Sequence, residues 1–98
     1  MSAYVISEVE ILHEPLANEY RALAAASIER FGGRYLVRGA EPHVAEGEST
    51  TRRIVIVEFP TMERLNEWYA SAAYAKALVL RARALDRRLM FVEGVRDA

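Results

Sequence analysis

The chain has 98 residues, 52% of them hydrophobic and none of them cysteine, so we expect one globular domain over residues 1–98 and exclude a disulfide framework and thiolate chemistry. The 13 basic and 14 acidic residues nearly balance and are interspersed, which argues against a nucleic-acid partner. Because the chain shows no basic leader and no run of eighteen apolar residues, we expect a cytoplasmic protein with no membrane partner.

The first half of the chain predicts a strand, a helix and a second strand. Residues 3–11 alternate in polarity, which is typical of a strand with one buried face. Apolar residues then recur at helical spacing over residues 15–31, and Gly32 is suited to follow a helix end. Residues 34–38 predict the second strand, and the Gly-, Pro- and Ser-containing residues 39–51 predict a surface excursion.

The second half of the chain predicts a strand, a divided helix and a last strand. Residues 53–59 predict a third strand, and Thr61 is placed to cap a helix after it. Ser71 is a second potential N-cap, so we expect the helix to break there and to resume as far as Ala84. Residues 88–95 predict the last strand.

The predicted order is that of an α+β, ferredoxin-like βαββαβ fold, with a four-stranded antiparallel sheet and the helices on one face. Residues 54–57 (IVIV) are apolar at consecutive positions, so they require cover on both faces of the sheet. The helices cover only one face. We therefore predict a homodimer packed sheet to sheet.

Several short motifs occur together in one order: residues 32–39 (GGRYLVRG), 46–47 (EG), 57–60 (VEFP), 68–71 (WYAS), Tyr74 and 92–94 (VEG). With these motifs the chain resembles the small bacterial family known as domain of unknown function 1330. The resemblance implies membership of the dimeric α/β-barrel superfamily, with the same fold and the same sheet-to-sheet dimer, and it supplies no reaction.

One departure from the family pattern is visible. Family members often have Ser-Pro before an acidic residue and the tyrosine, whereas this chain reads Ser71-Ala72-Ala73-Tyr74.

The wider superfamily includes cofactor-free quinol monooxygenases, heme-degrading monooxygenases and small isomerases. The heme enzymes resemble one another in an axial histidine downstream of a tryptophan, and this chain has no histidine from Thr61 onward. Heme is therefore not expected.

Two arginines in the second strand are candidate anion ligands. Simple alternation places Arg34 and Arg38 on one face, with Tyr35 on the opposite face. Arg34 is expected to pair with Glu58 of the neighbouring strand. Arg38 lies where the strand opens into the excursion, so Glu46 is either its permanent partner or a second wall of a ligand site.

Aromatic residues gather around the predicted helix break. Trp68, Tyr69 and Tyr74 offer a stacking surface with indole and phenol donors, and Tyr20 on the first helix can reach the same rim. The alternative is that these rings belong to the core. Trp68 and Tyr69 diverge by about 100° on a helix, so only one of them can point fully inward.

The sequence favours a domain that binds a small anionic or phenolic metabolite in a cleft between sheet and helices. In this hypothesis Arg38 orients the acid group, Trp68 and Tyr69 form an apolar wall, and Tyr20 or Tyr74 donates a hydrogen bond. The alternative is a non-catalytic homodimer with no ligand, in which these residues only complete the fold and the interface.

The sequence leaves open whether the protein is an enzyme. His13 and His43 lie in predicted turns with no further ligand at metal-binding spacing, and no phosphate loop or nucleophile motif is present. We therefore expect neither a metal nor another cofactor. Any reaction would be cofactor-free proton transfer or oxygenation, with a tyrosine or Glu46 as the base.

Overall fold

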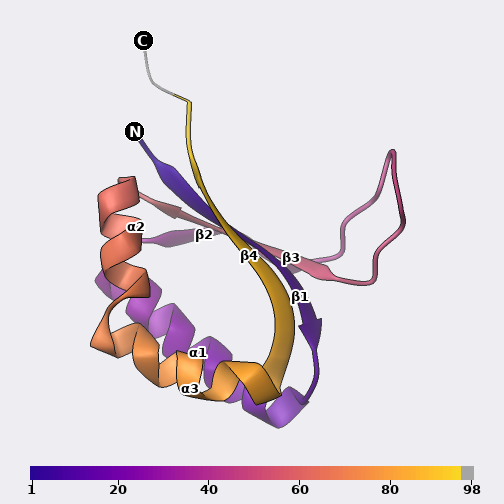
Figure 1. The fold of residues 1–98 in the computed structure, drawn as a ribbon, viewed down its shortest axis with the longest axis horizontal. Helices are drawn as coiled ribbons and strands as arrows, with labels where there is room; N and C mark the ends of the chain where they lie inside the picture. The colour runs from indigo at the N-terminus through magenta and orange to yellow at the C-terminus, as the bar shows by residue number, and fades with distance from the viewer. Residues whose placement is uncertain (96–98) are drawn as a thin grey trace.

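The computed structural model describes residues 1–95, so residues 96–98 of the expected domain lie outside the described part. The elements are β1 (Ala3–Ile11), α1 (Glu14–Arg30), β2 (Arg34–Ala40), β3 (Arg53–Phe59), α2 (Met62–Tyr69), α3 (Ala72–Ala84) and β4 (Leu85–Glu93). The strands form one antiparallel sheet in the spatial order β2-β3-β1-β4 (Figure 1). The predicted ferredoxin-like βαββαβ order is confirmed, with the second helix divided in two.

Each helix begins at a side chain that accepts from its first turn. The Nδ1 atom of His13 accepts a hydrogen bond from the backbone N–H of Leu16 at 3.3 Å. The hydroxyls of Thr61 and Ser71 accept from the N–H groups three residues later, at 3.0 and 3.1 Å. These bonds satisfy N–H groups that have no partner within the helix. The predicted break at Ser71 is thereby confirmed.

All three helices lie on one side of the sheet (Figure 1), and α1 packs alongside α3. The core lies between this helical layer and the inner face of the sheet. Burial of its apolar side chains supplies most of the driving force for folding. Its members include Val5, Ile28, Val57, Phe59, Leu65, Trp68 and Tyr74.

Strand β2 is irregular, which overturns the prediction that its two arginines share a face. Its pairing with β3 shifts register between Tyr35 and Val37 and again between Arg38 and Ala40. Because residues opposite each other in a sheet project to the same side, Arg34 lies on the outer face with its partner Glu58. Arg38 lies on the helix-facing side, as Tyr35 does. A bulge inserts one residue and so inverts the alternation beyond it.

The predicted pair between Arg34 and Glu58 is confirmed. The two residues are opposite each other in the sheet, and Arg34 Nε donates to Glu58 Oε1 at 2.6 Å. This hydrogen bond holds the pKa of the Glu58 carboxyl below its ordinary value, and hydrogen bonds from Ser2 and Tyr4 act in the same direction.

The last strand begins earlier than predicted. Helix α3 ends at Ala84 and β4 starts directly at Leu85, which pairs with Ile11 of β1. The prediction placed the start at Arg88 and was wrong by three residues. This early start brings Arg87 into the sheet, opposite Val9 and on the helix-facing side.

The outer face carries an apolar row with one residue from each strand. Val37 lies opposite Ile56, Ile56 opposite Ile6, and Ile6 opposite Met90. All four side chains are half-buried within this chain, and no helix covers this side of the sheet (Figure 1). The apolar cover that residues 54–57 require is therefore absent from one face of the single chain.

Candidate functional site

A cleft of about 480 Å³ lies between α1 and the inner face of the sheet. All four strands line it, together with α1 and one residue of α2. Its volume falls within the range of small-molecule sites. The residues that determine its chemistry are Ser7, Tyr20, Tyr35, Arg38, Trp68 and Arg87.

The register of the sheet places the polar groups of the cleft floor. One row runs from Arg38 through Val55 and Ser7 to Leu89, with one residue from each strand. Arg87 lies in the neighbouring row, opposite Val9, and is thus a diagonal neighbour of Ser7. The floor therefore carries an arginine at each edge strand and a hydroxyl near its centre, with apolar side chains between them.

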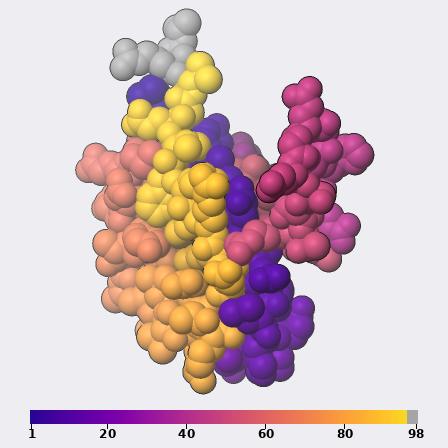
Figure 2. All heavy atoms as spheres, turned by 45° about the vertical axis from the view of Figure 1, so that its right-hand side comes forward, coloured from indigo at the N-terminus to yellow at the C-terminus, as the bar shows by residue number. Residues whose placement is uncertain are grey.

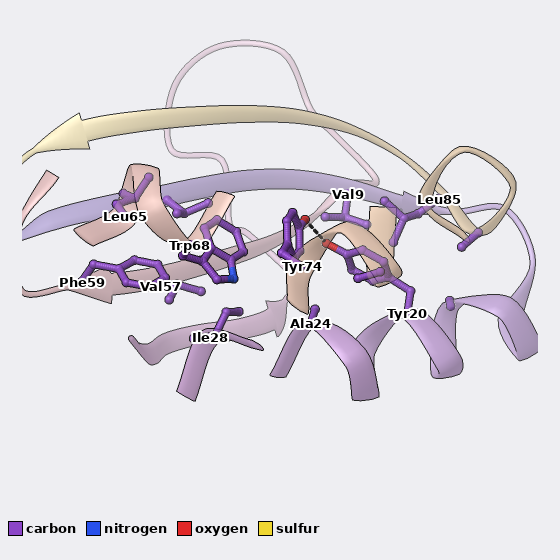
Figure 3. Close-up of a cluster of buried hydrophobic side chains, with 14 of the residues drawn as sticks. Val9, Tyr20, Ala24, Ile28, Val57, Phe59, Leu65, Trp68, Tyr74 and Leu85 are labelled. Carbon is purple, nitrogen blue, oxygen red and sulfur yellow. Dashed lines mark hydrogen bonds between the residues drawn. The ribbon is translucent and has the colours of Figure 1, made fainter. Parts of the chain in front are cut away.

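The most polar part of the cleft is a cluster of two tyrosines and one arginine. The hydroxyls of Tyr20, on α1, and Tyr74, on α3, lie 2.6 Å apart (Figure 3). Arg87 donates from Nη1 to the Tyr20 oxygen at 2.7 Å and from Nη2 to the Tyr74 oxygen at 2.8 Å. Tyr74 is fully buried, and Tyr20 is 8% exposed. The cluster joins two helices to the edge strand β4.

The environment of Tyr20 keeps its phenol protonated. Burial raises the pKa of Tyr20 well above its ordinary value, the neighbouring Tyr74 phenol adds to the rise, and the Arg87 charge only partly opposes it. Arginine itself stays charged in proteins. Tyr20 is therefore a neutral hydrogen-bond donor near pH 7, and its phenol is unsuited to be a general base.

The cleft has two arginines without a carboxylate partner. Among its other charged groups, Glu14 lies 3.8 Å from Arg21, and Arg53 lies 3.2 Å from Glu41 outside the cleft. Within residues 1–95 neither Arg38 nor Arg87 makes an ion pair. The cleft therefore presents an excess of positive charge, which favours an anion.

Arg38 lies at the exposed edge of the cleft. Its guanidinium carbon is 4.2 Å from the centroid of the Tyr35 ring, a distance typical of a cation–π contact. Glu46, its expected companion, lies in the exposed segment between β2 and β3, which stands out from the body of the molecule (Figure 2). Glu46 does not line the cleft, and it makes no ion pair with Arg38 in the described part of the chain.

The predicted aromatic residues divide between the core and its rim. Trp68 is 2% exposed, lines the cleft, and donates from Nε1 to the Ser27 hydroxyl at 3.0 Å. Its ring lies 4.2 Å from that of Tyr74, centroid to centroid. Tyr69 is 39% exposed and packs edge-on against Phe91, outside the cleft. Of the predicted aromatic wall, only Trp68 lines the cavity.

Two residues of the site were not predicted. Arg87 was missed because the last strand was started one residue after it, although Leu85, Arg87 and Leu89 alternate at strand spacing. Ser7 occupies the apolar side of the first strand, between Val5 and Val9. A lone hydroxyl among inward-facing apolar residues was a signal that sequence reasoning could have used.

In the described part of the chain, no group of three or more His, Cys, Asp or Glu residues is arranged to hold a metal ion. None of the described helices is both long enough and apolar enough to cross a membrane.

Comparison with known proteins identifies related folds. Residues 2–95 match the model of a family described as a domain of unknown function, DUF1330. No curated protein matches the chain in sequence. A protein of unknown function from Rhodopseudomonas palustris is similar in structure, with a TM-score of 0.79 at 17% identity, over 98% of this chain and 84% of that one.

Two further solved structures share the fold. SnoaB, a cofactor-independent oxygenase from Streptomyces nogalater, aligns with a TM-score of 0.68 at 10% identity, over 98% of this chain and 95% of SnoaB. A dimeric ferredoxin-like protein of unknown function from Jannaschia sp. aligns with a TM-score of 0.70 at 11% identity, over 96% of this chain and all of the other.

The hydrogen bonds of the cluster predict a stability difference between two tyrosines. Tyr74→Phe removes one bond to Tyr20 and one from Arg87 inside the protein, so it should lower the free energy of unfolding by about 1–2 kcal/mol. Tyr69→Phe, whose hydroxyl makes no hydrogen bond within residues 1–95, is the matched control and should change it by less than about 0.5 kcal/mol. Urea denaturation measures both values, and equal effects would contradict the role of the cluster.

Proposed function

This chain belongs to the DUF1330 family, and we propose that it is a homodimer that binds a small anionic or phenolic metabolite in the cleft between the sheet and α1. The observation that carries the proposal is the pair of arginines, Arg38 and Arg87, that line the cleft without a carboxylate partner in the described chain. A cation held in a concave site away from any anion lowers the energy of a bound anion. The lack of cysteine fits the cytoplasmic location that we include in the proposal.

The walls of the cleft favour a ligand that is flat or apolar apart from its acid group. Trp68 and Tyr35 supply aromatic surface, and Val55 and Leu89 supply aliphatic surface. Sites for small molecules usually combine such apolar walls with a few polar groups that fix orientation. A carboxylate or phenolate attached to a small apolar body matches both features.

The dimer is proposed from the outer face of the sheet. Its central row, Val37, Ile56, Ile6 and Met90, is apolar, and oppositely charged residues lie on both sides of it. Arg34 and Glu58 lie to one side, and Glu8 lies opposite Arg88 on the other. Because each flank carries both signs, a second copy related by a two-fold axis can match it.

We extend the proposal to cofactor-free chemistry on the bound anion. SnoaB, which shares only the fold, is a cofactor-independent oxygenase. The donors around Arg87 would stabilise negative charge that develops on a ligand oxygen. Glu46 and Tyr20 are poorly suited to act as the base, since Glu46 does not line the cleft and burial raises the pKa of Tyr20. Glu14 is the carboxylate that lines it.

Trp68, the only tryptophan of the chain, provides the test of binding. Titration with benzoate, salicylate and 4-hydroxybenzoate should change its fluorescence and raise the melting temperature, whereas neutral benzamide should not. Arg87→Gln should weaken the response to the acids about 10- to 100-fold. Arg83→Gln, at an exposed position on α3, should leave it unchanged.

Failure of every acid to bind would favour the alternative, a non-catalytic homodimer without a ligand. Equal responses in the Arg87 and Arg83 variants would remove Arg87 from the site.

The dimer has a separate test. The wild-type protein should sediment at twice the chain mass of 11.1 kDa at micromolar concentration. Ile56→Lys places a charge at the centre of the apolar row and should yield a monomer. Val79→Lys, at a position that is 75% exposed on α3, should remain dimeric. A monomeric wild-type protein would contradict the proposal.

A further inference from the structure

We propose that the ligand presents an oxyanion, a carboxylate or phenolate oxygen, to the hydroxyl of Tyr20, and that Tyr74 and Arg87 fix this hydroxyl as a donor aimed into the cleft. This inference rests on the proposed function and assigns the acid group a place beside Arg87 instead of at Arg38. It also predicts that the deprotonated form of the ligand binds in preference to the neutral form.

One hydrogen bond joins the two phenols, and its proton belongs to Tyr74. Among the described residues, the hydrogen-bond partners of the Tyr74 hydroxyl are Tyr20 and Arg87, and Tyr74 does not line the cleft. Arginine has no acceptor, so the Tyr20 oxygen is the acceptor available to the Tyr74 proton. In the opposite arrangement a fully buried O–H group would have no partner, which costs about 1–3 kcal/mol. Tyr74 therefore donates to Tyr20.

The Tyr20 hydroxyl is thereby left as a free donor. Its oxygen accepts from Tyr74 and from Arg87 Nη1, which uses both of its lone pairs. Its own proton has no protein acceptor within residues 1–95, and Tyr20 lines the cleft. Bonds that a hydroxyl accepts strengthen the bond that it donates. Tyr20 is thus a polarised donor that faces the ligand.

Arg87 and Ser7, which lie near Tyr20, also favour a ligand group that accepts hydrogen bonds. The Arg87 guanidinium has five N–H donors, and two nitrogens carry its bonds to the phenols. Ser7 lines the same cleft, and its hydroxyl is buried without a hydrogen-bond partner. One rotamer step about χ1 redirects this hydroxyl. The subsite offers donors and positive charge, and the Tyr20 oxygen has no lone pair left for a ligand donor.

The other charged groups of the cleft do not reverse this preference. Glu14 and Arg21 lie beside each other, and Arg53 pairs with Glu41. Arg38 stacks on Tyr35 and adds positive charge. No histidine lines the cleft, so a change in binding near neutral pH would arise from the ligand.

The probe for the test is 4-nitrophenol, whose phenolate absorbs visible light while the neutral phenol does not. Bound to the wild-type protein, it should ionise at a lower pH than in free solution. Tyr20→Phe should weaken phenolate binding about 10- to 100-fold. Tyr69→Phe, which alters a phenol outside the cleft, is the control and should bind as the wild type does.

Tyr74→Phe separates a positioning role from a merely structural one. The variant retains the Tyr20 donor but frees one lone pair on its oxygen, so neutral 4-nitrophenol gains an acceptor. Phenolate affinity should change by less than about 5-fold, while the preference for phenolate over phenol should fall several-fold. A general loosening of the cleft would weaken both forms together.

Ser7→Ala gives a readout that does not depend on the tyrosines. Because this hydroxyl is buried without a partner, its removal should leave the melting temperature unchanged or raise it by up to about 5 °C. The same variant should weaken phenolate binding about 3- to 10-fold. A clear loss of thermal stability would show that the hydroxyl serves the fold instead.

The outcomes distinguish the two proposals. If the wild-type protein binds neither form of 4-nitrophenol and none of the aromatic acids, the proposed function and this subsite both fall. If it binds the acids but prefers the neutral phenol, or if Tyr20→Phe binds phenolate as the wild type does, only the subsite is overturned. If Tyr20→Phe does not fold, the Ser7→Ala and Tyr74→Phe results decide.

Discussion

Arg87 holds a positive charge beside two phenols and, within the described chain, no carboxylate. Its hydrogen bonds tie α1, through Tyr20, and α3, through Tyr74, to the edge strand β4. The helical layer is thus fixed over the sheet by polar contacts at one end of the cleft. The phenol oxygens accept two hydrogen bonds from the guanidinium without neutralising its charge, so the charge stays available to a ligand.

The two faces of the sheet differ in their charged residues because β2 contains bulges. The register shifts turn Arg34 outward to Glu58 and Arg38 inward to the cleft. A regular strand would have placed both arginines on one face. The outer face then retains an apolar row flanked by charges of both signs, which suits a second copy. The inner face keeps an excess of positive charge, which suits an anion.

The order of the elements was predictable because it depends on local patterns. Alternation gives the strands, the hydroxyls of Thr61 and Ser71 mark helix starts, and the IVIV run of residues 54–57 indicates a sheet that needs cover on both sides. The pair between Arg34 and Glu58 followed from antiparallel neighbours. These inferences need only local sequence patterns and the order of the strands.

The site was less predictable because it depends on register and on residues far apart in sequence. Simple alternation does not predict the register shift between Tyr35 and Val37, so Arg38 was assigned to the wrong face relative to Arg34. The contact between Tyr20 and Tyr74 spans 54 positions. Arg87 was missed because α3 passes into β4 without a loop, and no turn residue marks the boundary.

The most direct measurement is a crystal structure of the protein bound to 4-nitrophenolate. We predict that the phenolate oxygen lies within hydrogen-bond distance of the Tyr20 hydroxyl, beside Arg87, with the ring against Trp68. A phenolate bound instead at Arg38, with the Tyr20 hydroxyl donating to a protein acceptor, would contradict it.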